Sequence, residues 1–399
     1  MNTSPLRRSA GLRAGASNDQ TRRHNLSTLL AILQQEGAQS RAQLTAHTLL
    51  NRSTIADLVG ELVELGLVVE GAPVGTNQVG RPSPMVHPSE DVLAIAVNPE
   101  VDAITVGLVG LRGRVLRRVR VPTATAPSLA EAVQISADVI RTLVADRPKG
   151  SRIVGVGAAV PGLVRAADGL VRFAPHLDWH EAPYAELLSA ATGLPVAAAN
   201  DASLGAIAER RYGAGRGVDD LVYLNGGASG IGGGIIADGE PFGGVDGYAG
   251  EWGHITVSGA VDGGDVLEDL VNQSRLLKIL GLGPEEVDQL DAALQATTDP
   301  EVIAEIRQQQ SLLGGAIRNA VHVLNPKLVI LGGFLGSLYN ANPEFLAERV
   351  SERALKAPME SARITAAGLG AELLLVGGAE LAFEPLLADP AGYAWPSVA

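Results

Sequence analysis

A carboxylate and an imidazole lie close together in the glycine-rich stretch GYAGEWGHITV, residues 247–257, at Glu251 and His254. Such a pair could bind a metal ion, move a proton or hydrogen-bond a polar ligand. A second polar pair, Asn200 and Asp201, ends the apolar stretch PVAAAN and begins the next segment. Ligands of open α/β sheets bind outside the carboxyl ends of strands, so this pair is also a candidate for ligand contact.

Each of these residues has a structural alternative. Asp201 could cap the helix predicted for ASLGAIAERR, and Glu251 could pair with an arginine on the surface. A single histidine such as His254 is more often a structural residue than a ligand. The functional interpretation therefore depends on the elements that position these side chains together.

From residue 89 onward, the sequence alternates between apolar stretches and amphipathic stretches, which indicates an α/β fold. Neighbouring strands are predicted at VLAIAVN, AITVGLVG and RGRVLRRVRV, followed by an amphipathic helix and the buried strand RIVGVGAAVPG. A second group of strands follows at LVYLNGG and GIGGGIIADGE. Because strand hairpins followed by crossover helices occur twice, we expect two similar lobes with a cleft between them.

The N-terminal segment differs from the rest of the chain in charge. Residues 1–56 contain seven Arg but only Asp19 and Glu36, a net charge of +5, whereas the whole chain carries −13. The stretch QTRRHNLSTLLAILQQE places leucines at helical spacing. Ser40 followed by Gln43 is typical of a capping box that begins a second helix. NRSTIADLVGELVELG predicts a third helix, so the order is that of a helix-turn-helix.

The third helix would place its polar N-terminal residues against base edges or phosphates. Asn51 or Ser53 is the expected N-cap. LVVEG and PSPMVHP then predict two strands around a loop, a wing. The candidate DNA-binding residues are Arg41, Asn51, Arg52, Ser53, Thr54 and Arg81. A small helical protein-interaction domain is the alternative.

Composition excludes several other classes of protein. The chain has no cysteine, which rules out disulfides and cysteine zinc sites. It has no apolar run of the ~18–20 residues that a membrane span needs. Its first residues lack the apolar region of a secretory signal. We therefore expect a soluble, cytoplasmic protein.

The ordered motifs of residues 20–385 resemble those of the ROK family of repressors and sugar kinases. These motifs are VGVGAAVPGLV, PHLDW, GLPVAAANDASLGAIAERRYGAG, GGASGIGGGIIADGEPFGG, GYAGEWGHITV and NPKLVILGG. The N-terminal helices and GRPSP resemble the repressor branch of that family. The resemblance implies a winged helix-turn-helix followed by a two-lobed, actin-like or ribonuclease H-like domain.

The resemblance also implies a carbohydrate site. In ROK sugar kinases the aspartate at the position of Asp201 takes a proton from a sugar hydroxyl. Carboxylates, an amide and an imidazole are groups that hydrogen-bond polyols. The sugar-binding residues implied in this chain are Asn200, Asp201, Glu251, His254 and Glu268.

Two departures from the family pattern argue against kinase activity and against zinc. The phosphate-binding turn of ROK kinases is replaced by Asn98-Pro99-Glu100-Val101-Asp102, which has no glycine. Pro99 has no N–H, and two carboxylates would repel phosphate. The cysteines that bind zinc in many members are missing, and Asp262 and Asp265 are the nearest candidate ligands. We expect no metal, no cofactor and no catalysis.

The sequence thus predicts four segments. Residues 1–19 would be a disordered arm, and 20–88 the winged helix-turn-helix. Residues 89–205 would form the first lobe, completed by a C-terminal helix at 375–388, and 206–374 the second.

The predicted function is that of a sugar-responsive repressor that binds a double-stranded DNA operator. The chain would form a homodimer or higher homo-oligomer, and its effector would be a sugar or a sugar phosphate. An active ROK sugar kinase with an appended DNA-binding head is the main alternative. A regulator with a vestigial pocket, controlled by a partner protein, is a third.

Overall fold

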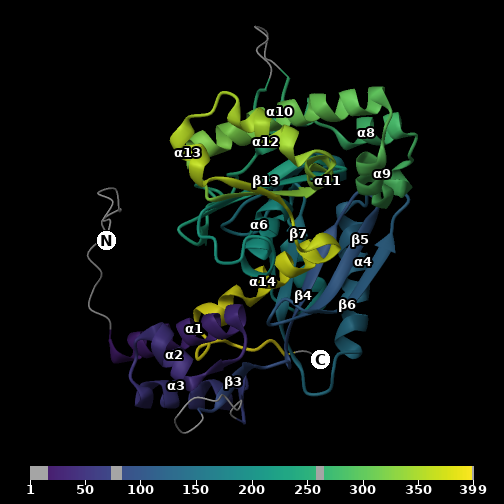
Figure 1. The fold of residues 1–399 in the computed structure, drawn as a ribbon. Helices are drawn as coiled ribbons and strands as arrows, with labels where there is room; N and C mark the ends of the chain where they lie inside the picture. Colours follow the sequence, from purple (N-terminus) through teal and green to yellow (C-terminus); the bar gives the residue numbers. More distant parts are fainter. Residues whose placement is uncertain (1–16, 73–82, 258–264, 398–399) are drawn as a thin grey trace. The chain divides into compact units, whose positions relative to one another are not determined.

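The computed structural model describes residues 17–72, 83–257 and 265–397. The chain divides into two compact units, each with its own helices and sheets (Figure 1). Unit 1 comprises Met1–Glu90 and Glu384–Ala394, and unit 2 comprises Asp91–Phe383 and Trp395–Ala399. The division falls within one helix, α14 (Leu373–Ala388), so unit 1 is discontinuous in the sequence.

The described residues of unit 1 form three complete helices, the end of α14 and a small antiparallel sheet of strand order β1-β3-β2. The helices are α1 (Asn18–Glu36), α2 (Arg41–Thr48) and α3 (Arg52–Glu64). The strands are β1 (Gln39–Ser40), β2 (Val68–Gly71) and β3 (Met85–Pro88).

Side-chain caps fix where the helices of unit 1 begin. Ser40 Oγ accepts a hydrogen bond from the N–H of Gln43, and Gln43 Oε1 accepts one from the N–H of Ser40, so the predicted capping box is confirmed. Asn51, rather than Ser53, caps α3: its Oδ1 accepts the N–H of Thr54 at 2.9 Å. Ser17 caps α1, so residues 18 and 19 are helical. The predicted arm at residues 1–19 was therefore too long at its end. Residues 1–16 lie outside the described residues.

The core of unit 1 is the predicted leucine face of α1 packed with the apolar face of α3. Its fully buried side chains include Leu26, Leu29, Leu30, Leu33, Ile55 and Leu62. The second segment of the unit contributes an ion pair, in which Arg23 Nη1 lies 2.9 Å from Asp389 Oδ2.

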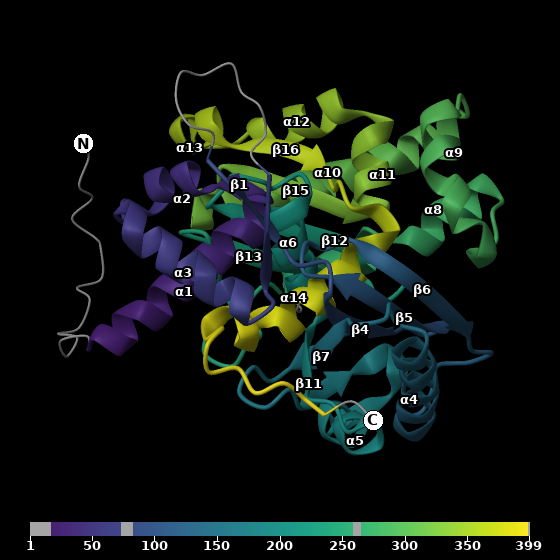
Figure 2. The same cartoon turned by 90° about the horizontal axis from the view of Figure 1, so that it is seen from below.

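The first sheet of unit 2 has the order β11-β7-β4-β5-β6. Its strands are β4 (Val92–Pro99), β5 (Ala103–Gly110), β6 (Val115–Pro122), β7 (Arg152–Val160) and β11 (Val196–Asn200). β4, β5 and β6 are antiparallel neighbours as predicted, whereas β7 and β11 run parallel to β4. Helices α4 (Leu129–Ala145) and α5 (Tyr184–Thr192) lie side by side over one face of this sheet (Figure 2).

The second sheet of unit 2 has the order β14-β13-β12-β15-β16. Its strands are β12 (Leu221–Gly227), β13 (Gly230–Ala237), β14 (Glu240–Pro241), β15 (Leu328–Gly333) and β16 (Arg363–Ala366). Helices α10 (Pro300–Leu324) and α11 (Phe334–Ala341) cover one face. Helices α6 (Asp201–Tyr212) and α14 cover the other. The predicted boundary between lobes, after residue 205, falls inside α6.

Shorter elements complete unit 2. A small antiparallel sheet contains β8 (Leu163–Val164), β9 (Val171–Ala174) and β10 (Trp179–Ala182). The remaining helices are α7 (Leu267–Leu270), α8 (Gln273–Leu280), α9 (Leu290–Ala296), α12 (Pro343–Ser351) and α13 (Lys356–Ser361). None of the described helices is both long and apolar enough to cross a membrane.

Glycines allow α14 to pack directly on the first sheet. A Cβ on Gly157 of β7 would lie 1.8 Å from the carbonyl oxygen of Gly378, and one on Gly378 would lie 2.8 Å from the carbonyl oxygen of Gly157. The adjacent Gly377 approaches the backbone of Leu204 in α6 in the same way. The helix therefore contacts β7 of the first sheet and helix α6 through backbone atoms, at distances that only glycine permits.

We expect Gly157→Ala to destabilise the protein, because the new methyl group would overlap the backbone of α14. Overpacking of a core costs about 1–3 kcal/mol, and here the obstacle is backbone, which cannot rotate away. Chemical denaturation would measure the loss. The control is Gly315→Ala in α10, where the nearest atom to an added Cβ is 3.7 Å away. That substitution should stabilise the helix by about 1 kcal/mol. Equal stability of the Gly157 variant and the natural chain would contradict the packing.

Candidate functional site

A cavity of about 530 Å³ in unit 2 brings together the predicted ligand residues. Asn200 and Asp201 come from the junction of β11 and α6, and Glu251 and His254 from the loop around the short helix η2 (Trp252–His254). Glu268 comes from α7. All five line the same cavity, although they are separated by up to 68 positions in the sequence.

The strand-to-helix junction orients its two side chains differently. Asn200 Oδ1 accepts the N–H of Ser203 at 2.8 Å, so Asn200 is the N-cap of α6, and the alternative that Asp201 caps it is wrong. Asn200 Nδ2 donates to the carbonyl oxygen of Gly162 at 3.0 Å. Asp201 Oδ1 accepts the N–H of Ala202 at 2.7 Å. Asn200 is thereby held in place, and the Asp201 carboxyl faces the cavity.

Gly230 and Gly253 leave room for the Glu268 carboxylate because neither has a side chain. A Cβ on Gly230 would lie 2.4 Å from Glu268 Oε2, and one on Gly253 would lie 2.5 Å from the same oxygen. The N–H of Ile231 donates to that oxygen at 3.1 Å. His254 Nε2 is 3.9 Å from Glu268 Oε1, and its side chain is exposed. The glycine-rich sequence therefore serves to position a carboxylate.

The cavity concentrates negative charge. Burial raises the pKa of Asp201 above its ordinary value of 3.8, an effect that the hydrogen bond from Ala202 partly offsets. Burial also raises the pKa of Glu251; His254 lowers it, and the charges of Asp201 and Glu268 raise it further. No Lys or Arg is among the described residues that line this cavity. A ligand here must satisfy several acceptors without bringing negative charge of its own.

Two side chains of this cavity were not predicted. Phe173 of β9 and His176 of the short helix η1 (Pro175–Leu177) line it. Phe173 offers an aromatic surface and His176 a second imidazole, and such groups bind the apolar and polar faces of a sugar ring. The motif PHLDW, which begins at Pro175, was the available signal, but its residue types alone do not indicate which side chain faces a ligand.

Unit 1 places the candidate DNA-binding residues in different environments. Arg52 and Ser53 are exposed in the first turn of α3, with Thr54 partly exposed beside them. Asn51 and Ser53 are hydrogen-bonded to one another, Ser53 Oγ donating to Asn51 Oδ1 at 2.7 Å. Arg41 forms a bidentate ion pair with Glu70 of β2. Arg81 lies outside the described residues.

The described residues contain no group of three or more His, Asp or Glu side chains that could hold a metal ion. Asp262, one of the two acidic candidates, lies outside them. The other, Asp265, directly precedes the short antiparallel bridge between Val266 and Thr256. The absence of metal stays a prediction.

Comparison with known proteins identifies relatives over most of the chain. The model of the ROK family matches residues 94–384. A xylose repressor of Caldicellulosiruptor bescii is 28% identical over 376 residues, covering 88% of this chain and 93% of its own length.

Two solved structures show the same architecture. A ROK family transcriptional regulator, a homologue of the E. coli MLC protein, superposes with a TM-score of 0.76 at 22% identity, covering 92% of this chain and 97% of its own. A ROK family glucokinase from Streptomyces griseus, in complex with glucose and AMPPNP, gives a TM-score of 0.57 at 28% identity. It covers 73% of this chain and 99% of its own.

We expect Asp201→Asn to raise the melting temperature at neutral pH. A carboxyl whose pKa is higher in the folded than in the unfolded state destabilises the fold as pH rises from the unfolded toward the folded pKa. The amide removes that penalty and can still accept the N–H of Ala202. Relief of this penalty should therefore appear as a higher melting temperature of the Asp201→Asn variant than of the natural chain. The gain should shrink as the pH is lowered through the folded pKa, as scanning calorimetry would show.

Asp168→Asn is the control for this measurement. Arg165 and the N–H of Leu170 hold the pKa of the exposed Asp168 carboxyl at about 2. A lowered pKa contributes stability that is present at neutral pH and lost on acidification, so this substitution should not raise the melting temperature. If Asp201→Asn lowers it at neutral pH, the burial penalty inferred for Asp201 is wrong.

Proposed function

The chain belongs to the ROK family, and we propose that it is a transcriptional repressor whose affinity for DNA responds to an unphosphorylated sugar. The sugar would bind in the cavity of Asp201 and Glu251, and DNA would bind to unit 1. The proposal includes an N-terminal DNA-binding segment followed by two lobes, a homodimeric assembly and action in the cytoplasm.

The extent of the similarity to a repressor carries this proposal. The family match at 94–384 spans about as much of the chain as the 73% covered by the glucokinase structure. The xylose repressor of C. bescii covers 88%, which necessarily includes part of the N-terminal segment. The relative that is named a repressor therefore shares residues outside the segment common to the kinases.

The chemistry of the cavity supports a neutral sugar as the effector. Asp201, Glu251 and Glu268 supply hydrogen-bond acceptors, Asn200 is a preoriented amide, and the two histidines can donate. Sites built to hydrogen-bond hydroxyls reject analogues that lack them. A phosphate group would bring its charge next to the carboxylates in a partly buried cavity with no Lys or Arg among its described lining residues. Of the two effector classes predicted, we therefore propose the unphosphorylated one.

Unit 1 has the elements that a winged helix-turn-helix requires. Helices α2 and α3 are joined by a short turn, and Leu49 in that turn adopts a left-handed conformation with φ of 58°. The antiparallel pair β2 and β3 follows. We propose that Arg52 and Thr54, at the start of α3, contact the major groove, and that a dimer reads two half-sites.

The turn at residues 98–102 argues against the kinase alternative. Strand β4 ends at Pro99, which has no N–H, and the N–H of Glu100 donates to the carbonyl oxygen of Ala103 at 2.8 Å. Neither Pro99 nor Glu100 can therefore donate a backbone hydrogen bond to a phosphate. The carboxylates of Glu100 and Asp102 add repulsion, whereas phosphoryl transfer depends on positioning and neutralising phosphate charge.

We expect Arg52→Ala to weaken operator binding by about 1–3 kcal/mol if Arg52 reads a base, with relaxed specificity at that position. If it contacts only phosphate, all sequences should lose affinity equally and the salt dependence should fall. Fluorescence anisotropy with operator DNA distinguishes the two cases. Arg114→Ala, an exposed arginine of unit 2, makes the same charge change and should leave binding intact. Unchanged binding by the Arg52 variant would show that the recognition helix is misassigned.

Glu251→Gln should abolish the sugar response while leaving operator affinity unchanged. A hydrogen bond to a charged group contributes about 1.5–3 kcal/mol, so sugar affinity should fall about tenfold or more. Thermal stabilisation by pentoses, hexoses and their phosphates would identify the effector. No stabilisation by any sugar would favour the regulator with a vestigial pocket.

Sugar-dependent ATP hydrolysis should be undetectable in a coupled assay of the purified protein. The reason is that the backbone N–H of Glu100 already donates to Ala103 and that the carboxylates of this turn repel phosphate. Turnover at ordinary kinase rates of ~1–100 per second would establish the enzyme alternative.

A further inference from the structure

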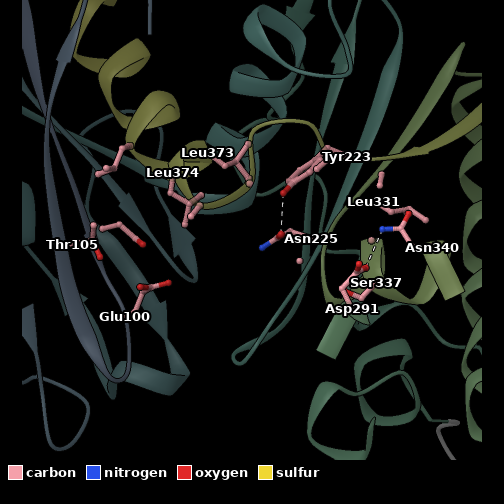
Figure 3. Close-up of a pocket in the computed structure, with 18 of the residues that line it drawn as sticks. Glu100, Thr105, Tyr223, Asn225, Asp291, Leu331, Ser337, Asn340, Leu373 and Leu374 are labelled. Carbon is pink, nitrogen blue, oxygen red and sulfur yellow. Dashed lines mark hydrogen bonds between the residues drawn. The ribbon is translucent and has the colours of Figure 1, made fainter. Parts of the chain in front are cut away.

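A second cavity of about 490 Å³ lies in unit 2, apart from the sugar cavity (Figure 3). One wall carries Glu100 and Thr105, and the opposite wall carries Asp291, Ser337 and Asn340. The first turn of α14 supplies an apolar surface through its leucines. Asn225 is the only residue that lines both cavities within the described part of the chain. The volume is within the range of small-molecule sites.

Glu100 brings to the first wall a carboxylate that forms no ion pair with the described residues. Its backbone is fixed by the hydrogen bond from its N–H to Ala103, but no donor among the described residues reaches its carboxyl group. Arg120, one of the arginines of β6, is already paired with Asp102 at 2.6 Å. Burial raises the pKa of Glu100 and the charge of Asp102 raises it further, while the charges of Arg120 and Arg118 lower it in part.

Thr105 is a second unpaired polar group on the same wall. It lies opposite Asn98 in the register of β4 and β5, and its side chain is only 5% exposed. Its hydroxyl has no hydrogen-bond partner among the described residues and lines the cavity, so it is available to a ligand. The Glu100 carboxylate and the Thr105 hydroxyl can therefore both accept hydrogen bonds from a ligand that carries N–H or O–H donors.

The opposite wall also carries a charge. Asp291 of α9 accepts hydrogen bonds from the amides of Asn340 at 3.0 Å and Gln295 at 2.6 Å. These donors are neutral, and Asp291 forms no ion pair with the described residues. Leu373 and Leu374 lie between the two walls, and Leu331 lies beside Asn340 on the wall of Asp291 (Figure 3). Arg118, exposed on β6, is the one described cation at the edge of the cavity.

We propose that this cavity binds a small aliphatic diamine, with one ammonium group on Glu100 and the other on Asp291. The hydrocarbon chain would pack on Leu373 and Leu374. A ligand with ammonium groups at both ends compensates both carboxylates, whereas a neutral ligand compensates neither. Phosphorylated ligands are repelled by both ends. This inference does not depend on the repressor function.

Isothermal titration of the full-length protein with putrescine, cadaverine and their longer homologues tests the proposal. We expect one diamine to bind per chain, with an optimum at one chain length, and pentylamine to bind at least about tenfold more weakly than the best diamine. No saturable diamine binding, or equal binding of pentylamine, would overturn the proposal. ATP that competes for the same site would also overturn it.

Charge-neutral variants locate the two ends. Glu100→Gln and Asp291→Asn should each lower the affinity for the best diamine to that for pentylamine. The affinity for sugar and the circular dichroism spectrum should stay unchanged. Glu360→Gln, an exposed residue of α13, removes the same charge elsewhere and should have no effect. Equal weakening by Glu360→Gln would show non-specific attraction of cations to an acidic protein and would refute a built site.

Discussion

The direct backbone contact between α14 and β7, at Gly378 and Gly157, determines how unit 2 is assembled. Because neither glycine has a side chain, the helix packs on the first sheet at backbone distance while Leu373 and Val376 pack into the core of the second. Glu380, buried in the same helix, accepts hydrogen bonds from Arg211 and from Tyr212 and so ties it to α6. One helix thus holds two sheets in a common position. Both cavities depend on that position, since each has walls from both sheets.

The cavity of Asp201, Glu251 and Glu268 places charges where they lower the stability of the fold. Three carboxylates face one cavity, and two have pKa values raised first by burial, so the folded state at neutral pH carries charges that would be better solvated in the unfolded chain. Such strain persists only where the surroundings impose it. Here the glycines at 230 and 253 and the N–H of Ile231 fix the third carboxylate, and the cap at Asn200 fixes the first. Hydroxyl donors of a ligand would offset part of the penalty.

Local features of the sequence predicted local structure well. The leucine spacing of α1, the Ser40 capping box and the polar pair at the end of β11 each depend on residues within one or two turns of chain. Contacts between distant segments were not predictable in this way. The pairing of Arg41 with Glu70, the approach of Phe173 to the sugar cavity and the opposition of Glu100 to Asp291 follow from tertiary packing. The strands β8 to β10 are also too short to show a hydrophobic period.

The discontinuity of unit 1 has a consequence for biosynthesis. Residues 1–90 are synthesised before unit 2, yet Glu384–Ala394, which belong to the same unit, emerge only after Asp91–Phe383. At ~5–20 residues per second, the interval is on the order of tens of seconds. During that time Arg23 lacks its ion-pair partner Asp389. A chain that stalls before residue 384 therefore never completes unit 1.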